Sequence, residues 1–467
     1  MLYITNGLRW TGCNLSHLIY SRSIHSVVCA VSGGVDSAVS AYLLKKKGFL
    51  VKGVFMTNWD ALDEEIGCSV NKDRQDAQYV CDYLGIPFFE KNFVKEYWNY
   101  VFLPLIKSYE QGATPNPDIL CNRFVKFNML TKTVLRSNKQ CFDNNDDQIS
   151  LNLTADAIAT GHYCQNSFGN YLQHRKDNVE ATLLRSVDPV KDQTFWLSTI
   201  SHKELQYCMF PVGHLLKTQV KQIAQDIGLS RIYSRRESMG MCFIGKRRFS
   251  EFIDNYLEPR PGICKDFETD QVLEEHTGVH HFTLGQRVPM KRFNGPYYVS
   301  KMDYHKQIIY VVRDPTHPSL FMRKCWCGPA VWINSAPFSS TNLKNIQFQW
   351  QNKWRPIKCN LKPFNDISLA AAYIRKDVKR CFSKSDNATL ANTIDASIED
   401  NREIGPCLSI ELEVPMRCLA PGQWCAFYDG NVCLGGAMIC GSISLWEEGQ
   451  DTPHNEWKYT DYELTYV

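Results

Sequence analysis

The feature that most restricts the fold of this chain is a loop with paired glycines between a strand pattern and a helix pattern. Residues 26–31 form a short run rich in valine, and residues 36–47 repeat apolar side chains at helical spacing before Gly48. The sequence Ser-Gly-Gly-Val-Asp-Ser, residues 32–37, joins the two. A strand that turns this tightly into a helix is typical of α/β folds built on a parallel sheet.

The same alternation continues as far as residue 237. Strands are expected at residues 51–56, 88–89 and 155–160, and helices at residues 72–84, 97–106, 203–208 and 217–227. Alternating patterns of this kind predict βαβ units. We therefore predict that residues 26–237 form an α/β domain with a doubly wound, Rossmann-like parallel sheet.

The pattern changes after about Ser238. Short β-type runs appear at residues 281–284, 297–299 and 308–312, and short strands between Gly, Pro and Asn clusters follow to the end. This predicts a small central domain, residues 238–310, and a C-terminal β-barrel, residues 311–467. Two polar segments, residues 137–153 and 366–405, are expected to be surface insertions.

Composition limits the class of protein. The chain has 467 residues, 44% hydrophobic and 22% charged, which is typical of globular proteins. Its net charge of +3 neither requires nor excludes nucleic acid, because binding depends on a basic face. No apolar run approaches the ~18 residues that span a bilayer, so no membrane partner is expected. The 19 cysteines are odd in number and irregularly spaced, which favours a reducing compartment.

The amino-terminal segment differs from the rest. Asp36 is the first acidic residue, and the segment before it carries Arg9, Arg22 and several serines among apolar residues. An acid-free leader with arginine and serine is typical of a mitochondrial transit peptide, which we predict for residues 1–25. The alternative is a short frayed terminus that happens to lack acids.

The glycine loop has the chemistry of a phosphate site. Gly33 and Gly34 allow the backbone to approach a phosphate closely, and the following helix directs its N–H groups at the anion. Ser32 and Ser37 add hydroxyl donors, and Asp36 suggests a Mg²⁺ ion between carboxylate and phosphates. The lysine of a Walker loop is absent. The alternative is an ordinary strand–turn–helix with a Ser or Asp cap.

Two of the cysteines stand out by their surroundings. Cys121 follows Asn116-Pro117-Asp118 before a helix expected to begin near Arg123, and a thiol at a helix N-terminus has a lowered pKa. Asp118 could act as a general acid or base. Cys242 lies in Gly-Met-Cys-Phe-Ile-Gly, residues 240–245. The other cysteines are expected to be buried core residues, and Cys325-Trp326-Cys327 lacks a second ligand pair, so no metal site is predicted there.

Taken together, the motifs resemble the tRNA-specific 2-thiouridylase family of the PP-loop ATP-pyrophosphatase group, in particular its mitochondrial branch. Seven blocks carry the resemblance in order along the chain: residues 32–37, 55–60, 116–121, 159–163, 188–193, 240–245 and 281–287. The resemblance implies that ATP adenylates the carbonyl at position 2 of the wobble uridine in the tRNA anticodon stem-loop. A persulfide on Cys242 then delivers sulfur, and Cys121 either releases sulfide from it or resolves it as a disulfide. The sulfur donor would be a cysteine desulfurase or a relay protein.

The resemblance also implies which residues bind. The nucleotide would contact Ala30, Val31, Ser32, Gly33, Gly34, Val35, Asp36, Ser37, Met56 and Gly161. The tRNA would contact Asn116, Pro117, Asp118, Lys191, Asp192 and Gln193. Gln349-Trp350 aligns with an Arg-Tyr pair that the family places on the barrel for tRNA contact, and Trp350 could stack on a base. Lys191, Arg231, Arg235 and Arg236 are expected to contact tRNA phosphates.

Two other functions compete with this one. A PP-loop amidating ligase would adenylate a carboxylate, but it needs a glutaminase domain or an ammonia source, and it leaves Cys121 and Cys242 unexplained. A non-catalytic RNA-binding protein with a degenerate loop would have lost loop glycines or one of the two cysteines, and neither is lost.

Overall fold

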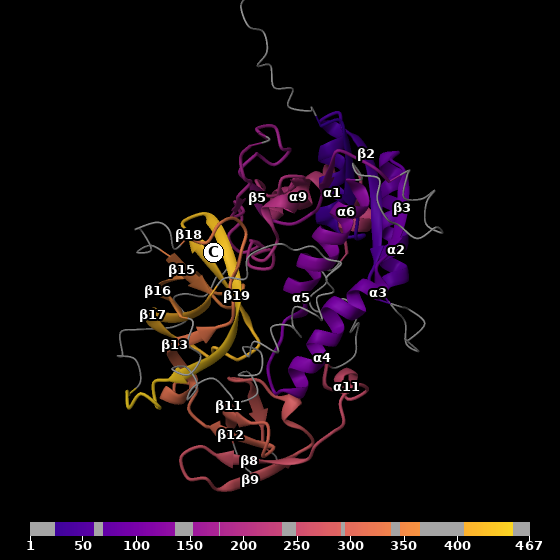
Figure 1. Ribbon diagram of the computed structural model, residues 1–467. Helices are drawn as coiled ribbons and strands as arrows, with labels where there is room; N and C mark the ends of the chain where they lie inside the picture. Colours follow the sequence, from indigo (N-terminus) through magenta and orange to yellow (C-terminus); the bar gives the residue numbers. More distant parts are fainter. Residues whose placement is uncertain are drawn as a thin grey trace, which may run out of the picture.

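The computed structural model describes residues 24–59, 69–135, 153–176, 178–235, 249–290, 295–337, 346–364 and 406–451. Three predictions fall outside these ranges: nearly all of the leader, nearly all of the two polar insertions, and the positions of Arg236 and Cys242. Figure 1 shows three regions, with an α/β region joined to a barrel at one side and a smaller sheet below.

The α/β region is built on a five-stranded sheet in which every pairing is parallel. Its order is β3-β2-β1-β4-β7. The strands are β1 (Ser26–Ala30), β2 (Leu50–Thr57), β3 (Phe88–Asn92), β4 (Ala157–Ala159) and β7 (Cys208–Met209). The order reverses direction beside β1, and ligands of such sheets bind at the carboxyl ends of the strands at this switch point. The predicted doubly wound parallel sheet is confirmed.

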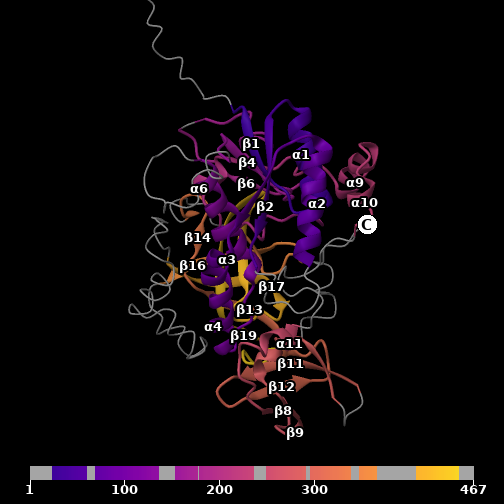
Figure 2. The ribbon, with the colours of Figure 1, turned by 90° about the vertical axis from the view of Figure 1, so that its right-hand side faces the viewer.

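Helices cover this sheet. α1 (Val35–Lys46) packs on β1 and β2 and also contacts α2 (Ser69–Leu84) and α9 (Lys217–Asp226). Figure 2 shows α1 and α2 side by side, with α9 and α10 (Ser230–Tyr233) next to them. A short helix, α8 (His202–Leu205), precedes β7 and begins at Ser201 with a capping box. The apolar side chains between helices and sheet form the largest buried cluster of the described residues.

Two long helices lead away from the sheet toward the smaller regions (Figure 1). The first runs through α3 (Val94–Tyr97), η2 (Trp98–Phe102) and α4 (Leu103–Glu110), and the second through α5 (Pro117–Leu120), η3 (Cys121–Met129) and α6 (Leu130–Val134). The second helix begins at Pro117 and not near Arg123, so that prediction is wrong. Asn116 caps it by accepting from Asp118 N at 2.9 Å, and proline at the first helical position is a strong start signal.

The central region is a five-stranded sheet in the order β10-β11-β12-β8-β9. Its elements are α11 (Phe249–Ile253), β8 (Gly262–Asp266), β9 (Val272–His276), η4 (Val279–His281), β10 (Arg287–Pro289), β11 (Pro296–Asp303) and β12 (Ile308–Val312). The strand predicted at residues 281–284 is wrong, because His281 ends the 3-10 helix η4 and the next residues form a loop.

The C-terminal region is a closed antiparallel barrel, as predicted. Its strands are β13 (Phe321–Cys327), β15 (Ile346–Gln349), β16 (Ile357–Phe364), β17 (Cys407–Arg417), β18 (Trp424–Asp429) and β19 (Val432–Ser444). β13 pairs with both β17 and β19 and so closes the barrel. β14 (Val331–Trp332) also pairs with β19, and η5 (Pro318–Leu320) precedes β13.

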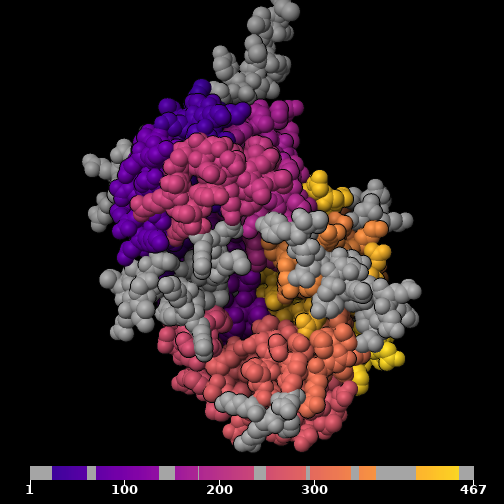
Figure 3. Space-filling view, turned by 180° about the vertical axis from the view of Figure 1, so that it is seen from behind, coloured from indigo at the N-terminus to yellow at the C-terminus, as the bar shows by residue number. Residues whose placement is uncertain are grey.

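Two short strands connect the barrel to the α/β region. β6 (Leu183–Leu184) pairs with β19, and β5 (Gln165–Asn166) pairs with β6. The barrel sheet therefore ends in strands from the first half of the chain. Figure 3 shows the α/β region (indigo to magenta), the central region (salmon) and the barrel (orange to yellow) surrounding a hollowed face. In the part of the chain that the structure describes, no helix is long and apolar enough to span a membrane.

Candidate active site

The two loop glycines have different structural roles. Gly33 has φ +77°, and a Cβ there would lie 2.5 Å from the carbonyl oxygen of Asp73 in α2. Gly34 is extended (φ −89°), and among the described residues a Cβ there would approach only Ser32 Oγ, at 3.4 Å. Gly33 is therefore required by the fold. Gly34 leaves open space at the start of α1, where a phosphate would meet the helix N–H groups.

The loop serines shape this open space. Ser37 Oγ accepts from Ser32 N at 3.1 Å and donates to Gly34 O at 3.0 Å. Ser32 Oγ lies 3.2 Å from Ser37 Oγ. Ser37 is buried, whereas Ser32 is exposed. Ser37 thus holds the turn in place, and the Ser32 hydroxyl is accessible to a ligand.

Asp36 is engaged by an ion pair that the sequence did not reveal. Lys217 Nζ donates to its two carboxylate oxygens at 2.7 and 2.8 Å, and Tyr163 Oη donates to Oδ1 at 2.8 Å. Lys217 is buried and is the first residue of α9. A lysine in the first turn opposes the helix dipole, and this unfavourable placement was the one sequence signal for it. Lys217 brings a cation to the phosphate loop in the place where we predicted a metal ion.

A second cation, Arg235, also contacts the loop. Arg235 Nη1 donates to Gly33 O at 3.2 Å and to Asp76 Oδ2 at 2.9 Å, and its Nη2 pairs with Asp73. Arg231 pairs with Asp76 Oδ1 at 2.6 Å. Asp76 is buried, so these cations compensate a carboxylate that would otherwise be costly. The structure therefore engages Arg231 and Arg235 in intramolecular pairs, and their role as tRNA phosphate contacts stays a prediction.

Four further predicted nucleotide positions lie at the carboxyl edge of the sheet. A Cβ at Gly161 would lie 2.6 Å from Ser37 N, so glycine is needed there for the chain after β4 to pass the start of α1. Met56 is half-buried near the end of β2, where it pairs with Lys91. Ala30 and Val31, at the end of β1, are buried. The structure brings all the predicted nucleotide positions to this edge.

Cys121 lies one turn inside its helix rather than at the helix N-terminus. It is buried in an aromatic cluster with Trp59 and Phe124, into which Phe252 of α11 also packs. Its helix has the wider π form from Cys121 to Met129, a geometry that is often found at functional sites. Burial raises the pKa of the nearby Asp118 carboxyl, and the charge of Lys126 opposes this shift. A raised pKa suits a general acid.

The segment before Cys121 lies where the three regions meet. Thr114 N donates to Pro421 O of the barrel at 2.8 Å, and Thr114 Oγ1 lies 3.0 Å from Thr283 Oγ1 of the central region. Gly422 approaches so closely that a Cβ there would lie 2.8 Å from Thr114 N. Asn116 and Pro117 follow directly, so the predicted base-contacting residues are held at a three-way junction.

The described residues that flank the segment with Cys242 contact both parts of the predicted site. Residues 236–248 lie outside the described ranges, but Arg235 before them contacts the phosphate loop. α11 begins directly after them, and its Phe252 and Ile253 pack into the cluster that contains Cys121. The described residues on either side of Cys242 therefore contact the phosphate loop and the surroundings of Cys121.

The predicted tRNA block at residues 188–193 is largely engaged inside the protein. Asp192 is buried and accepts from Arg185 Nη1 at 2.8 Å and from Thr194 Oγ1 at 2.8 Å. Gln193 Oε1 accepts from Tyr163 N at 2.9 Å. Burial also raises the pKa of the Asp192 carboxyl, against the charge of Arg185. These contacts argue that Asp192 orders the loop, whereas Lys191 is half-exposed.

Gln349 and Trp350 are not placed for tRNA contact. Both are buried in the barrel. Gln349 donates to Trp354 O at 2.7 Å, and the ring of Trp350 stacks on that of Trp354 with centroids 5.6 Å apart. The expectation that Trp350 stacks on a base is wrong for this structure, because its side chain is only 1% exposed.

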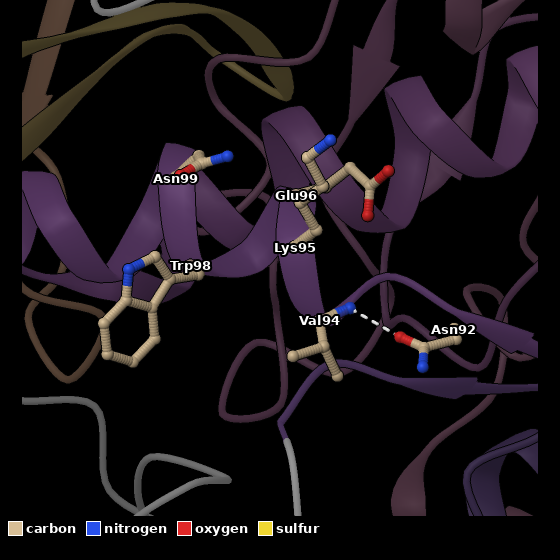
Figure 4. A pocket seen from close by; sticks show the side chains of 6 residues that line it. All are labelled: Asn92, Val94, Lys95, Glu96, Trp98 and Asn99. Carbon is tan, nitrogen blue, oxygen red and sulfur yellow. Dashed lines mark hydrogen bonds between the residues drawn. The ribbon is translucent and has the colours of Figure 1, made fainter.

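A cavity of about 510 Å³ lies beside α3. Figure 4 shows its lining, with Trp98 and Asn99 on one side and Asn92 bound to the backbone of Val94 on the other. Its lining residues are Asn92, Val94, Lys95, Glu96, Trp98 and Asn99. None belongs to the predicted site, so the cavity gives no support to a nucleotide or thiol role.

Comparison with known proteins decides the family. Models described as tRNA methyl transferase HUP domain, tRNA methyl transferase PRC-barrel domain and aminomethyltransferase beta-barrel domain match residues 25–246, 250–313 and 391–439. The mitochondrial tRNA-specific 2-thiouridylase 1 of Drosophila melanogaster is 38% identical over 432 residues, which cover 92% of this chain and 97% of that protein. The chain belongs to the tRNA-specific 2-thiouridylase family.

Other relatives agree with this assignment. The Homo sapiens protein of the same name is 35% identical, covering 90% of this chain and 91% of its own length. The tRNA-specific 2-thiouridylase MnmA of Alkaliphilus oremlandii is 37% identical, covering 88% and 96%. Among solved structures, a 4-thiouridine synthetase–RNA complex with bound ATP is 15% identical and covers 50% of each chain, with a TM-score of 0.27. That likeness is too weak to carry an argument.

Proposed function

We propose that this chain is an ATP-dependent tRNA 2-thiouridylase, a sulfurtransferase that acts on the wobble uridine in mitochondria. One observation carries the proposal: Arg235, the last described residue before Cys242, donates to Gly33 O of the phosphate loop, and α11, the first described element after Cys242, packs into the cluster that contains Cys121. A nucleotide site and two thiols are the parts that this reaction requires. The family relation supports tRNA as the substrate, and the HUP-domain match supports the use of ATP.

The triphosphate would lie over Gly34, where the backbone leaves space and the N-terminus of α1 favours negative charge. The oxygen at position 2 of uridine would attack the α-phosphorus, so that the adenylyl group is transferred to it and pyrophosphate leaves. Lys217 pairs with Asp36 at the start of α1. Once phosphates bind there, the ammonium group of Lys217 would be shared between Asp36 and the phosphates and would neutralise part of the phosphate charge.

We propose that Mg²⁺ binds together with ATP, as the counterion of its phosphates. The described residues do not form a ready site for it at Asp36, because both carboxylate oxygens already accept from Lys217. The ion would therefore enter with the nucleotide rather than be held in advance by this side chain.

Sulfur would reach the base from a persulfide on Cys242, with release of AMP. In one course the Cys121 thiolate attacks the inner sulfur of this persulfide, so that a Cys121–Cys242 disulfide forms and hydrosulfide leaves; the hydrosulfide then attacks carbon 2 of the adenylated base and displaces AMP. In the other the terminal sulfur attacks the base directly, and Cys121 then resolves the bond between Cys242 and the transferred sulfur as a disulfide. An external thiol must reduce that disulfide before the next turnover. The aromatic cluster around Cys121 would keep water from the activated base.

Reconstitution tests the proposal directly. The purified chain should form 2-thiouridine in tRNA, measured by mass spectrometry, only when ATP and a protein persulfide donor are both supplied. AMP and pyrophosphate should appear in step with the product. Formation of an amide with ammonium and a carboxylate would favour a ligase, and tRNA binding without AMP release would favour a non-catalytic RNA-binding protein.

Localisation has its own test. The names of the animal relatives support the mitochondrion, and the composition of the leader agrees. A reporter fused to residues 1–30 should enter mitochondria, whereas the same fusion with Arg9 and Arg22 replaced by Glu should not. A reporter that stays in the cytosol would remove the leader as the import signal.

A further inference from the structure

A cluster of metal-ligating groups lies outside the proposed active site. One ligand atom from each of Asp254, His280 and His281 lies within 4.8 Å of the other two. Nε2 of His280 and Nε2 of His281 approach the same carboxylate oxygen, Oδ1 of Asp254, at 3.0 and 2.7 Å. Two imidazoles and one carboxylate that converge on one point are a common ligand set for divalent transition metals.

The geometry is close to what an ion of the zinc class needs. Bonds of about 2.0–2.1 Å in tetrahedral arrangement separate ligand atoms by roughly 3.3 Å. The two observed separations, 3.0 and 2.7 Å, are shorter than this by about 0.3 and 0.6 Å, so an outward shift of the partly exposed Asp254 side chain by about that much would admit the ion. The side chain of Asp254 is 34% exposed, which leaves a side open for water as a further ligand.

The surroundings hold both imidazoles in place. His281 Nδ1 lies 3.1 Å from Thr277 Oγ1, the kind of outer partner that fixes the tautomer of a ligating histidine. Gly278 makes room for His280, because a Cβ there would lie 2.4 Å from its Cε1. Within the described ranges no ion pair links any of the three side chains to lysine or arginine, so no cation opposes a metal ion.

We propose that Asp254, His280 and His281 bind a divalent transition-metal ion of the zinc class. The ligands come from two elements that are separate in the chain, since Asp254 directly follows α11 and the histidines belong to η4. α11 also packs into the cluster around Cys121. The ion would thus link η4 of the central region to α11, the first described helix after Cys242. Its role would be to stabilise the fold and not to take part in catalysis.

The test uses the full-length chain with Zn²⁺ and with Co²⁺ as a spectroscopic probe. One equivalent of Zn²⁺ should bind, and Asp254→Asn and His281→Gln should each weaken it by about 100-fold or more, since each removes one of three ligands. His305→Gln is the matched control, an exposed histidine between β11 and β12 of the same region. It should bind Zn²⁺ as the parent does.

The cysteines of this chain offer competing sites, and Co²⁺ separates them. Bound at the proposed site, Co²⁺ should show visible bands without the near-ultraviolet band of a thiolate–cobalt bond. Zn²⁺ should also raise the Tm of the parent and of His305→Gln but not of Asp254→Asn, whose exposed position leaves folding intact by circular dichroism. Equal Zn²⁺ affinity in all variants, no binding to the parent, or a thiolate band would overturn the proposal.

Discussion

The phosphate loop and the surroundings of Cys121 are organised by opposite physical means. The loop is held by charge: Lys217, from the start of α9, and Arg235, from the bend after α10, reach it and pair with carboxylates around it. Cys121 is held by apolar packing, with Trp59 and Phe252 among its neighbours. The loop is therefore preformed for an anion, whereas the thiol is shielded from water.

This difference suits the two half-reactions. Adenylation develops charge on phosphate oxygens, which fixed cations and helix N–H groups stabilise. Sulfur transfer must instead protect an activated base from hydrolysis, and exclusion of water serves that purpose. Variants that impair one half-reaction and spare the other would support this comparison, and variants that impair both would contradict it.

The largest expected effect is at the thiols. Cys121→Ser and Cys242→Ser should each lower 2-thiouridine formation by about a thousandfold or more, because serine cannot replace the transferring or resolving sulfur. ATP and tRNA affinities should stay within about twofold. Cys407→Ser is the control, since Cys407 is half-exposed in the barrel and has no proposed role. A Cys242→Ser protein that still thiolates tRNA with a persulfide donor would refute the mechanism.

The next effect separates the two loop glycines. Gly34→Val should weaken ATP binding by about 100-fold in calorimetry while the Tm changes little, since the new side chain would fill the phosphate space and its Cβ would approach only Ser32 Oγ, at 3.4 Å, among the described residues. Gly33→Ala should instead destabilise the fold by about 1–3 kcal/mol, because its φ is positive and Asp73 O lies in the way. Full ATP affinity in Gly34→Val would contradict the phosphate-loop assignment.

A smaller effect is expected at the buried cation. Lys217→Met should destabilise the protein by about 1–2 kcal/mol and weaken ATP binding by roughly tenfold, because Asp36 loses its partner and the phosphates lose a cation. In urea unfolding, Lys217→Met combined with Asp36→Asn should cost less than the sum of the single changes. Additive costs would show that the 2.7 Å ion pair contributes nothing measurable.

The contrast also explains what the sequence could predict. The parallel sheet, the loop and the barrel follow from local patterns, and the order of strand, Gly-rich turn and helix was enough to predict a phosphate site. The pairing of Lys217 with Asp36 and of Arg235 with Gly33 was not predicted, because these partners are 181 and 202 positions away and no local pattern encodes such pairing. Trp350 was misassigned for the same reason, since only the closed barrel buries it.

The smallest expected effect concerns how thermal stability changes with pH, and it has opposite signs at two aspartates. Burial raises the pKa of Asp118 above 3.8, so its contribution to stability is present below pH 3.8 and lost as the pH rises through the raised pKa. As the pH rises through this range, the Tm of Asp118→Asn should therefore rise relative to that of the parent, because the amide resembles the protonated acid.

Asp156 should behave in the opposite way. Burial acts to raise the pKa of its carboxyl, but hydrogen bonds from Ser26 and His25 outweigh this and leave the pKa lowered. Asp156→Asn should therefore lose Tm relative to the parent as the pH rises toward 3.8. Thermal unfolding of both variants between pH 3 and 7 checks this, and curves of the same sign would refute the assignment of Asp118 as the proton-retaining acid beside Cys121.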